Sequence, residues 1–238
     1  MTIQSQEQQG GTPSGGAQTL HTLRIKWLWI GASAFGAWAG TIIALFLFPS
    51  ASFGRNPTGL FSWSLLGFAL AIGILPGTFQ WLVFRDIAKS REIVRASFLV
   101  LWIPVTTIGV TVMILPLWWV SAEAISMTTG GAALVPMLPG AVLLGVAQWL
   151  LLHWVMRVRW TWIRQTIFGA WMGSGLGLLY ALGYSSLFRG SVQLALFSPF
   201  ISVEPIWALV TGANIAALQT IALLNALNTD LTRGWNQG

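Results

Sequence analysis

The chain has 238 residues, of which 55% are hydrophobic and only 8% are charged, and its mean hydropathy is +0.72. Soluble domains carry about 25% charged residues. Twelve basic and six acidic residues could not cover a water-exposed surface of this size, so the composition predicts a membrane protein. The chain contains no cysteine, which excludes disulfides, thiolate metal sites and thiol catalysis.

The first 19 residues are polar and rich in Gly, Gln, Ser and Thr. They lack the basic start and apolar core of a cleaved signal peptide, so we expect a flexible tail over 1–19. A transmembrane domain should follow over 20–228, and residues 229–238 should form a short cytoplasmic C-terminal tail.

Long apolar segments follow the tail, and a membrane-spanning helix needs about 20 such residues. Six segments meet this length, at residues 27–48, 60–84, 93–120, 132–156, 163–184 and 203–227. The third contains Pro104 and Pro116, so we expect it to be tilted, kinked or frayed. The sequence therefore predicts an all-α, polytopic transmembrane helical bundle of about six spans, with five spans as the alternative if one segment is re-entrant.

Basic residues fall on one side of this predicted topology. Ten of the twelve precede the first span or lie in the even-numbered loops and the C-terminal tail: Arg24, Lys26, Arg85, Lys89, Arg91, Arg95, Arg157, Arg159, Arg164 and Arg233. The opposite loops hold only Arg55 and Arg189. Because Lys and Arg mark the cytoplasmic side of short loops, we expect a multi-pass protein with both termini cytoplasmic. The lipid bilayer accounts for the basic charge, and no nucleic-acid partner is expected.

Two stretches share the pattern Gly-x-x-Gln-Trp-Leu: "GTFQWLVFRD" over 77–86 and "GVAQWLLLHWVMR" over 145–157. Their glutamines, Gln80 and Gln148, are 68 positions apart, and a further 71 positions lead to Gln219, which no Trp follows. Pairs of small residues four positions apart precede each glutamine and share a helix face with one another. These pairs are Gly73 and Gly77, Ala141 and Gly145, and Gly212 and Ala216.

The first helix of each predicted pair gives a similar spacing. "FGAW" occurs at 35–38 and again at 168–171, and we align Trp102 of the middle unit with the Trp of these motifs. The chain is thus predicted to form three tandem hairpins, over 27–84, 93–156 and 163–227. Because all three have the same orientation, they would be parallel repeats around an axis along the membrane normal. A two-plus-one packing is the alternative to pseudo-threefold symmetry.

The two stretches resemble a repeated Gly-x-x-Gln-Trp-Leu-x-Leu/Phe-Arg pattern found in uncharacterised bacterial polytopic membrane proteins, including cyanobacterial ones. The resemblance covers the first two hairpins well and the third poorly. It implies the architecture only, and it implies no catalytic residue and no activity. We separately expect the protein to be inserted in a bacterial cytoplasmic membrane or an internal membrane derived from it.

The glutamine amides cannot lie in hydrocarbon without partners. One interpretation is helix packing, in which small residues allow close approach and the amides bond across helices. Another is that Gln80, Gln148 and Gln219 contact a ligand, and a third is an error in the repeat register. Asn214 and Asn225 make the sixth span the most polar, so a substrate route would be sought there first.

Catalytic constellations are scarce. The centres of the predicted spans contain no Asp, Glu, Lys or Arg, which argues against proton-coupled transport through buried carboxylates. His21 and His153 are too far apart in the topology to form a metal site, so we expect no metal and no cofactor. Ser174 lies in the small-residue stretch "GSG", which we interpret as helix packing rather than serine catalysis.

The resulting expectation is a protein that is not an enzyme. The first hypothesis is a non-catalytic accessory or scaffold subunit of a membrane assembly, with a membrane-protein partner or a second copy of itself. The alternative is a small-molecule permease or a membrane substrate-binding component.

Overall fold

The computed structural model describes residues 15–48, 63–90, 96–115, 137–187 and 203–234. All elements within these ranges are helical: α1 (Gly15–Leu47), α2 (Trp63–Ser90), a 3-10 helix (Ala96–Leu101), α3 (Trp102–Ile114), α5 (Leu138–Met156), α6 (Thr161–Leu187) and α8 (Val203–Gly234). No strand occurs in the described ranges. The predicted all-α helical bundle is confirmed.

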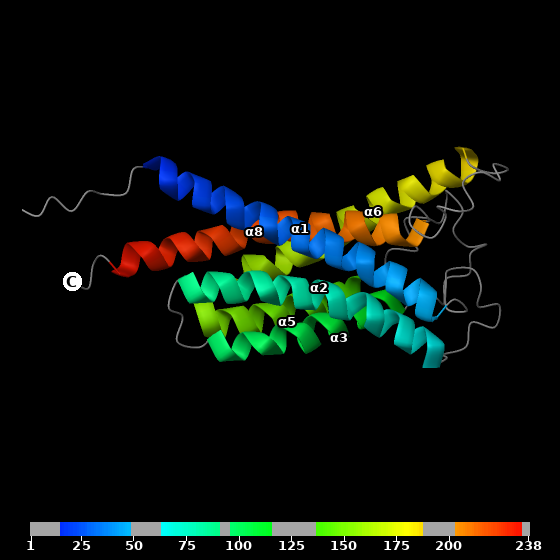
Figure 1. Ribbon diagram of the computed structural model, residues 1–238, viewed down its shortest axis with the longest axis horizontal. Coiled ribbons are helices and arrows are strands. Elements are labelled where there is room, and N and C mark those ends of the chain that lie inside the picture. Colours follow the sequence, from blue (N-terminus) through cyan, green and yellow to red (C-terminus); the bar gives the residue numbers. More distant parts are fainter. Residues whose placement is uncertain (1–14, 49–62, 91–95, 116–136, 188–202, 235–238) are drawn as a thin grey trace, which may run out of the picture.

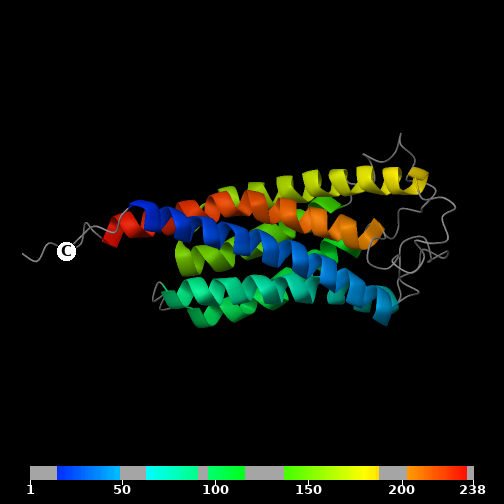
Figure 2. The same cartoon turned by 45° about the horizontal axis from the view of Figure 1, so that its top comes forward.

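The six α-helices lie along a common direction, and successive helices run in opposite directions (Figure 1). Each packs mainly against two others, in the order α1, α2, α3, α5, α6, α8 and back to α1. The described helices therefore form a closed ring, and the turned view in Figure 2 shows α8 lying between α1 and α6. The start of α1 and the end of α8 lie at the same end of the bundle (Figure 1).

We call this end the basic end, because the Lys and Arg side chains that the structure describes lie on the helix ends that meet there or in the turn between α5 and α6. They are Arg24, Lys26, Arg85, Lys89, Arg157, Arg159 and Arg164. The helices between the two ends bury no described charged side chain.

Four helical segments are long and apolar enough to cross a membrane: Thr22–Leu47, Trp63–Lys89, Leu138–Met156 and Glu204–Leu227. Large apolar side chains on the outside of the bundle are exposed, among them Trp27, Phe46 and Leu179. Exposure on this scale suits lipid rather than water, and these segments indicate a membrane-embedded protein. The described part of α3 is shorter, and α6 is not among the four, so the count of six spans stays a prediction.

Helix boundaries differ in places from the expected ones. α1 begins at Gly15, inside the segment expected to be a tail, and α8 continues to Gly234. Pro104 lies in the first turn of α3, where its missing N–H breaks no helical hydrogen bond. Residues 93–95 and 116–120 of the predicted third span lie outside the described residues.

Within each predicted hairpin the two helices touch at a glycine of the first helix. A Cβ added to Gly36, Gly109 or Gly169 would lie 2.6 Å from an atom of the second helix. The atoms are Cα of Pro76, Cδ1 of Leu144 and Cα of Ile215, each four positions before Gln80, Gln148 and Gln219 respectively. Glycine therefore sets the distance between the helices of each pair.

The small residues predicted to pack helices face a different neighbour. Gly73 and Gly77 of α2 approach α3, where added Cβ atoms would lie 2.8 Å from Thr107 Cα and 3.1 Å from the Ile103 carbonyl oxygen. Gly145 of α5 likewise approaches Ile163 and Thr166 of α6, and Gly212 of α8 approaches the carbonyl oxygen of Ser33 on α1. Ala141 and Ala216 are buried. The four glycines thus join one predicted hairpin to the next around the ring.

Candidate functional site

The three glutamines are buried near the middle of the bundle. Gln80, Gln148 and Gln219 are 5%, 2% and 0% exposed, and they come from α2, α5 and α8. An uncompensated amide at such a position costs several kcal/mol in an apolar medium, on the order of 2–7. Their hydrogen-bond partners therefore determine what the site can do.

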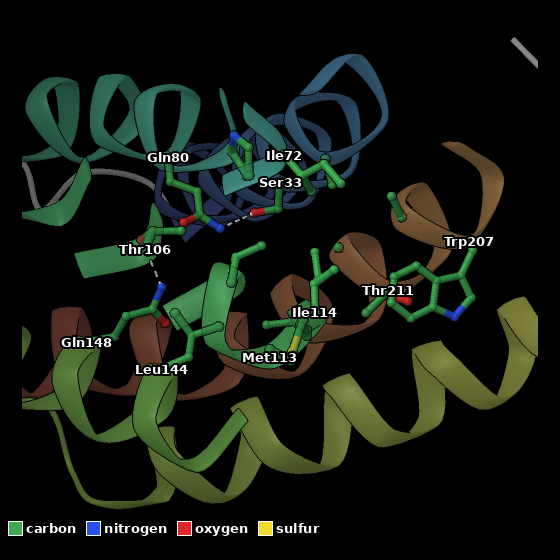
Figure 3. A pocket seen from close by; sticks show the side chains of 16 residues that line it. Ser33, Ile72, Gln80, Thr106, Met113, Ile114, Leu144, Gln148, Trp207 and Thr211 are labelled. Atoms are coloured by element: carbon green, nitrogen blue, oxygen red, sulfur yellow. Dashed lines mark hydrogen bonds between the residues drawn. The ribbon is translucent and has the colours of Figure 1, made fainter. Parts of the chain in front are cut away.

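Each amide nitrogen donates to a hydroxyl on the first helix of its own hairpin. Nε2 of Gln80 lies 2.7 Å from Oγ of Ser33, and Nε2 of Gln148 lies 3.1 Å from Oγ1 of Thr106 (Figure 3). Nε2 of Gln219 lies 2.7 Å from Oγ1 of Thr166. In every hairpin the same kind of bond thus joins the two helices.

Indole groups of the next hairpin supply donors to the amide oxygens. Nε1 of Trp102 donates to Oε1 of Gln80 at 2.8 Å, and Nε1 of Trp162 donates to Oε1 of Gln148 at 3.4 Å. Gln219 Nε2 also donates to Gln148 Oε1, at 3.0 Å. Because an indole N–H can only donate, these contacts fix which end of the first two amides is the oxygen.

A tryptophan cluster lies one helical turn from the hydroxyls, toward the basic end. Trp29, Trp102 and Trp162 are fully buried, and their ring centroids are 5.9, 6.1 and 6.1 Å apart. Phe84 packs against Trp29 at 4.6 Å and against Trp102 at 4.7 Å. Phe84, Leu152 and Leu223, each four positions after one of the glutamines, are also fully buried. The three indoles and these side chains therefore belong to one buried apolar cluster.

We call the three glutamines, together with the hydroxyl and tryptophan side chains of the first helices, the glutamine layer. Two of its buried atoms lack a hydrogen-bond partner. They are Nε1 of Trp29 and Oε1 of Gln219. Among the described residues, a Trp–Gln hydrogen bond thus joins the first hairpin to the second and the second to the third. The corresponding bond between the third hairpin and the first is missing.

A cavity of about 60 Å³ lies beside the glutamine layer. Ser33, Gln80, Thr106 and Gln148 line it together with largely apolar side chains, including Met113 (Figure 3). A water molecule needs about 10–15 Å³ of such space. The cavity has the volume of a few water molecules and is too small for a typical metabolite, for which pockets of about 300–1,000 Å³ are usual.

The two asparagines of the sixth predicted span do not share the glutamine face. Asn214 donates from Nδ2 to the carbonyl of Val210 on its own helix at 2.8 Å, and Asn225 is exposed. Residues on an α-helix advance by about 100° each, so Asn214 and Asn225 lie on one side of α8 and Gln219 about 120–140° away. The structure brings the three glutamines into one layer without these asparagines.

The alignment of Trp102 with Trp38 and Trp171 was wrong, because Trp102 occupies the same place in the cluster as Trp29 and Trp162. The missed signal is a short motif, Trp-Ile-x-x-Ser/Thr. It occurs three times, as "WIGAS" over 29–33, "WIPVT" over 102–106 and "WIRQT" over 162–166. Each copy supplies one indole and one hydroxyl of the glutamine layer.

No group of three or more metal-ligating side chains occurs among the described residues. The ring of His153 lies against Trp149, and its Nδ1 is 3.2 Å from the carbonyl oxygen of Val158, which also accepts the indole N–H of Trp149. His153 thus helps to hold the turn between α5 and α6. No protein-family model, curated protein or solved structure matches the chain.

Proposed function

We propose that the protein is a non-catalytic accessory or scaffold subunit of a membrane assembly. The observation that carries this proposal is that the buried amides bond to side chains of the bundle itself. A transport or binding site would need such groups to face a space that admits a ligand, whereas the cavity beside them measures only about 60 Å³. In a bilayer, bonds of this kind hold helices together.

The proposed architecture is three tandem hairpins with six spans. Its support is the threefold recurrence of the Trp-Ile-x-x-Ser/Thr motif and of the amide–hydroxyl bond that follows from it. The glycine contact four positions before each glutamine recurs in the same way.

We place the basic end on the cytoplasmic side of a bacterial cytoplasmic membrane or an internal membrane derived from it. Cations stack on tryptophans there: Lys26 over Trp27 at 5.7 Å, Arg85 over Trp81 at 5.3 Å and Arg164 over Trp160 at 5.3 Å. Basic and aromatic side chains of this kind favour the headgroup region.

The orientation can be tested with cysteines, since the chain has none. Lys89→Cys at the basic end should react with a membrane-impermeant maleimide only after the membrane has been permeabilised. Trp63→Cys, at the opposite end of α2, should react in intact cells. The reverse labelling pattern would refute the orientation.

The scaffold role is tested by native mass spectrometry after mild solubilisation from the native membrane. We expect a stoichiometric protein partner or a second copy of the chain, and no stoichiometric small molecule. A small molecule retained by the wild type and by the lipid-facing control Leu150→Ala, but lost in Gln148→Leu, would refute the scaffold role.

That outcome would support the alternative, a small-molecule permease or substrate-binding component. One observation favours it: Thr211 lines the cavity, and its buried Oγ1 has no hydrogen-bond partner.

A further inference from the structure

The unpaired atoms of the glutamine layer are complementary. Nε1 of Trp29 is a donor and Oε1 of Gln219 is an acceptor, and both side chains are fully buried. Leaving either without a partner costs more than a typical hydrogen bond contributes. Two such atoms in one layer of one bundle call for a common explanation.

Their positions in the chain supply it. Trp29 begins the first Trp-Ile-x-x-Ser/Thr motif, as Trp102 and Trp162 begin the second and third. Trp102 donates to the glutamine of the hairpin before its own, and so does Trp162. Since α8 packs against α1, the hairpin that follows the third around the ring is the first.

We propose that Trp29 donates its indole N–H to Oε1 of Gln219 and so closes a ring of three Trp–Gln hydrogen bonds. The two side chains share neighbours. The ring of Trp29 lies 6.1 Å from that of Trp162, whose acceptor Gln148 Oε1 also accepts from Gln219. Gln219 already uses its nitrogen for Gln148 and Thr166, so its oxygen is the atom left to receive a donor.

Closing the ring would join the first hairpin to the last. This proposal rests on the three-hairpin arrangement and is independent of the scaffold role. The same contact would form in a permease whose cytoplasmic end is closed. The double-mutant cycle below can therefore refute the Trp29–Gln219 contact without refuting the scaffold role, and native mass spectrometry can refute the scaffold role without refuting the contact.

A double-mutant cycle tests the contact on the full-length protein in mixed micelles, with unfolding by dodecyl sulfate followed by circular dichroism. The cycle combines Trp29→Phe, which keeps an aromatic ring but removes the N–H, with Gln219→Met. We expect the two changes to be coupled by about threefold to twentyfold in the unfolding equilibrium constant, the range for hydrogen bonds inside membranes. Trp102→Phe with Gln80→Met, which breaks a bond of 2.8 Å, is the positive control.

The negative control is Trp102→Phe with Gln219→Met, because the Trp102 N–H is bonded to Gln80. Coupling of Trp29 with Gln219 no larger than in this control would overturn the proposal. So would a Trp29→Phe protein at least as stable as the wild type, since removing a truly unpaired donor relieves a penalty.

A second measurement covers the case in which Gln219→Met does not fold. In protein labelled with 15N-tryptophan, the indole resonance missing from Trp29→Phe belongs to Trp29. It should exchange with deuterium as slowly as the Trp102 resonance and should shift in Gln219→Asn. An unshifted, free N–H resonance would refute the contact.

Discussion

Replacing Gln148 by leucine removes the side chain with the most described partners in the glutamine layer. The Gln148 amide donates to Thr106 and accepts from Trp162 and from Gln219. Leucine has a similar volume and suits the apolar surroundings, so the change tests hydrogen bonding more than packing. Gln219 keeps its bond to Thr166, whereas the indole N–H of Trp162 loses its acceptor.

The expected loss of stability follows from the number of bonds broken. Hydrogen bonds between membrane helices contribute about 0.6 kcal/mol on average and up to about 1.7 kcal/mol. Three such bonds give about 2–5 kcal/mol for Gln148→Leu, a large part of the stability of an ordinary domain. Gln80→Leu breaks two bonds, to Ser33 and Trp102, and should cost less.

Dodecyl sulfate unfolding in mixed micelles, followed by circular dichroism, measures the loss. Leu143→Ala, on the exposed face of the same helix, is the matched control and should change little. A Gln148→Leu protein as stable as the wild type would refute the reasoning, because the amide would then contribute nothing to holding the helices together.

Two further changes test the backbone contacts. Gly36→Ala places a methyl group against the backbone of Pro76 and should destabilise the protein by about 1–3 kcal/mol. In the control Gly31→Ala the added Cβ meets nothing within 4 Å, so this change should be neutral or stabilise the protein by up to about 1 kcal/mol. Equal effects of the two changes in the unfolding assay would contradict the close approach of α1 and α2. Arg157 caps the C-terminus of α5 in the left-handed region, with φ of 52°, where glycine is favoured. Arg157→Gly should therefore raise the free energy of unfolding by about 1 kcal/mol, and Arg159→Gly should not. A lower unfolding temperature for Arg157→Gly would show that the Arg157 side chain matters more than its backbone.

The helices could be predicted because membrane spans are set by local composition. Runs of apolar residues, interrupted by basic clusters, locate most of the described helices to within a turn or two. The ends were harder, since the polar residues after Gly15 carry no apolar signal although they continue α1.

The glutamine layer was partly visible in the sequence. A buried glutamine needs a partner, and the repeated pattern pointed to Gln80, Gln148 and Gln219. Their partners were harder to find because they lie on other helices, and hydroxyls such as those of Ser33 and Thr106 are too common to stand out. The Trp-Ile-x-x-Ser/Thr motif would have located them, but the more conspicuous "FGAW" pair drew the alignment nine positions too far along the first and third hairpins.

The way the amides are shared between hairpins also dictates an order of assembly. A hairpin emerging from the ribosome can pair its own glutamine nitrogen with its own hydroxyl, but the oxygen must wait for the tryptophan of the hairpin made next. Chains are synthesised from the N-terminus, so Gln80 is completed by Trp102 and Gln148 by Trp162. A chain that ends after the second hairpin lacks both donors to the Gln148 oxygen, because Trp162 and Gln219 belong to the third.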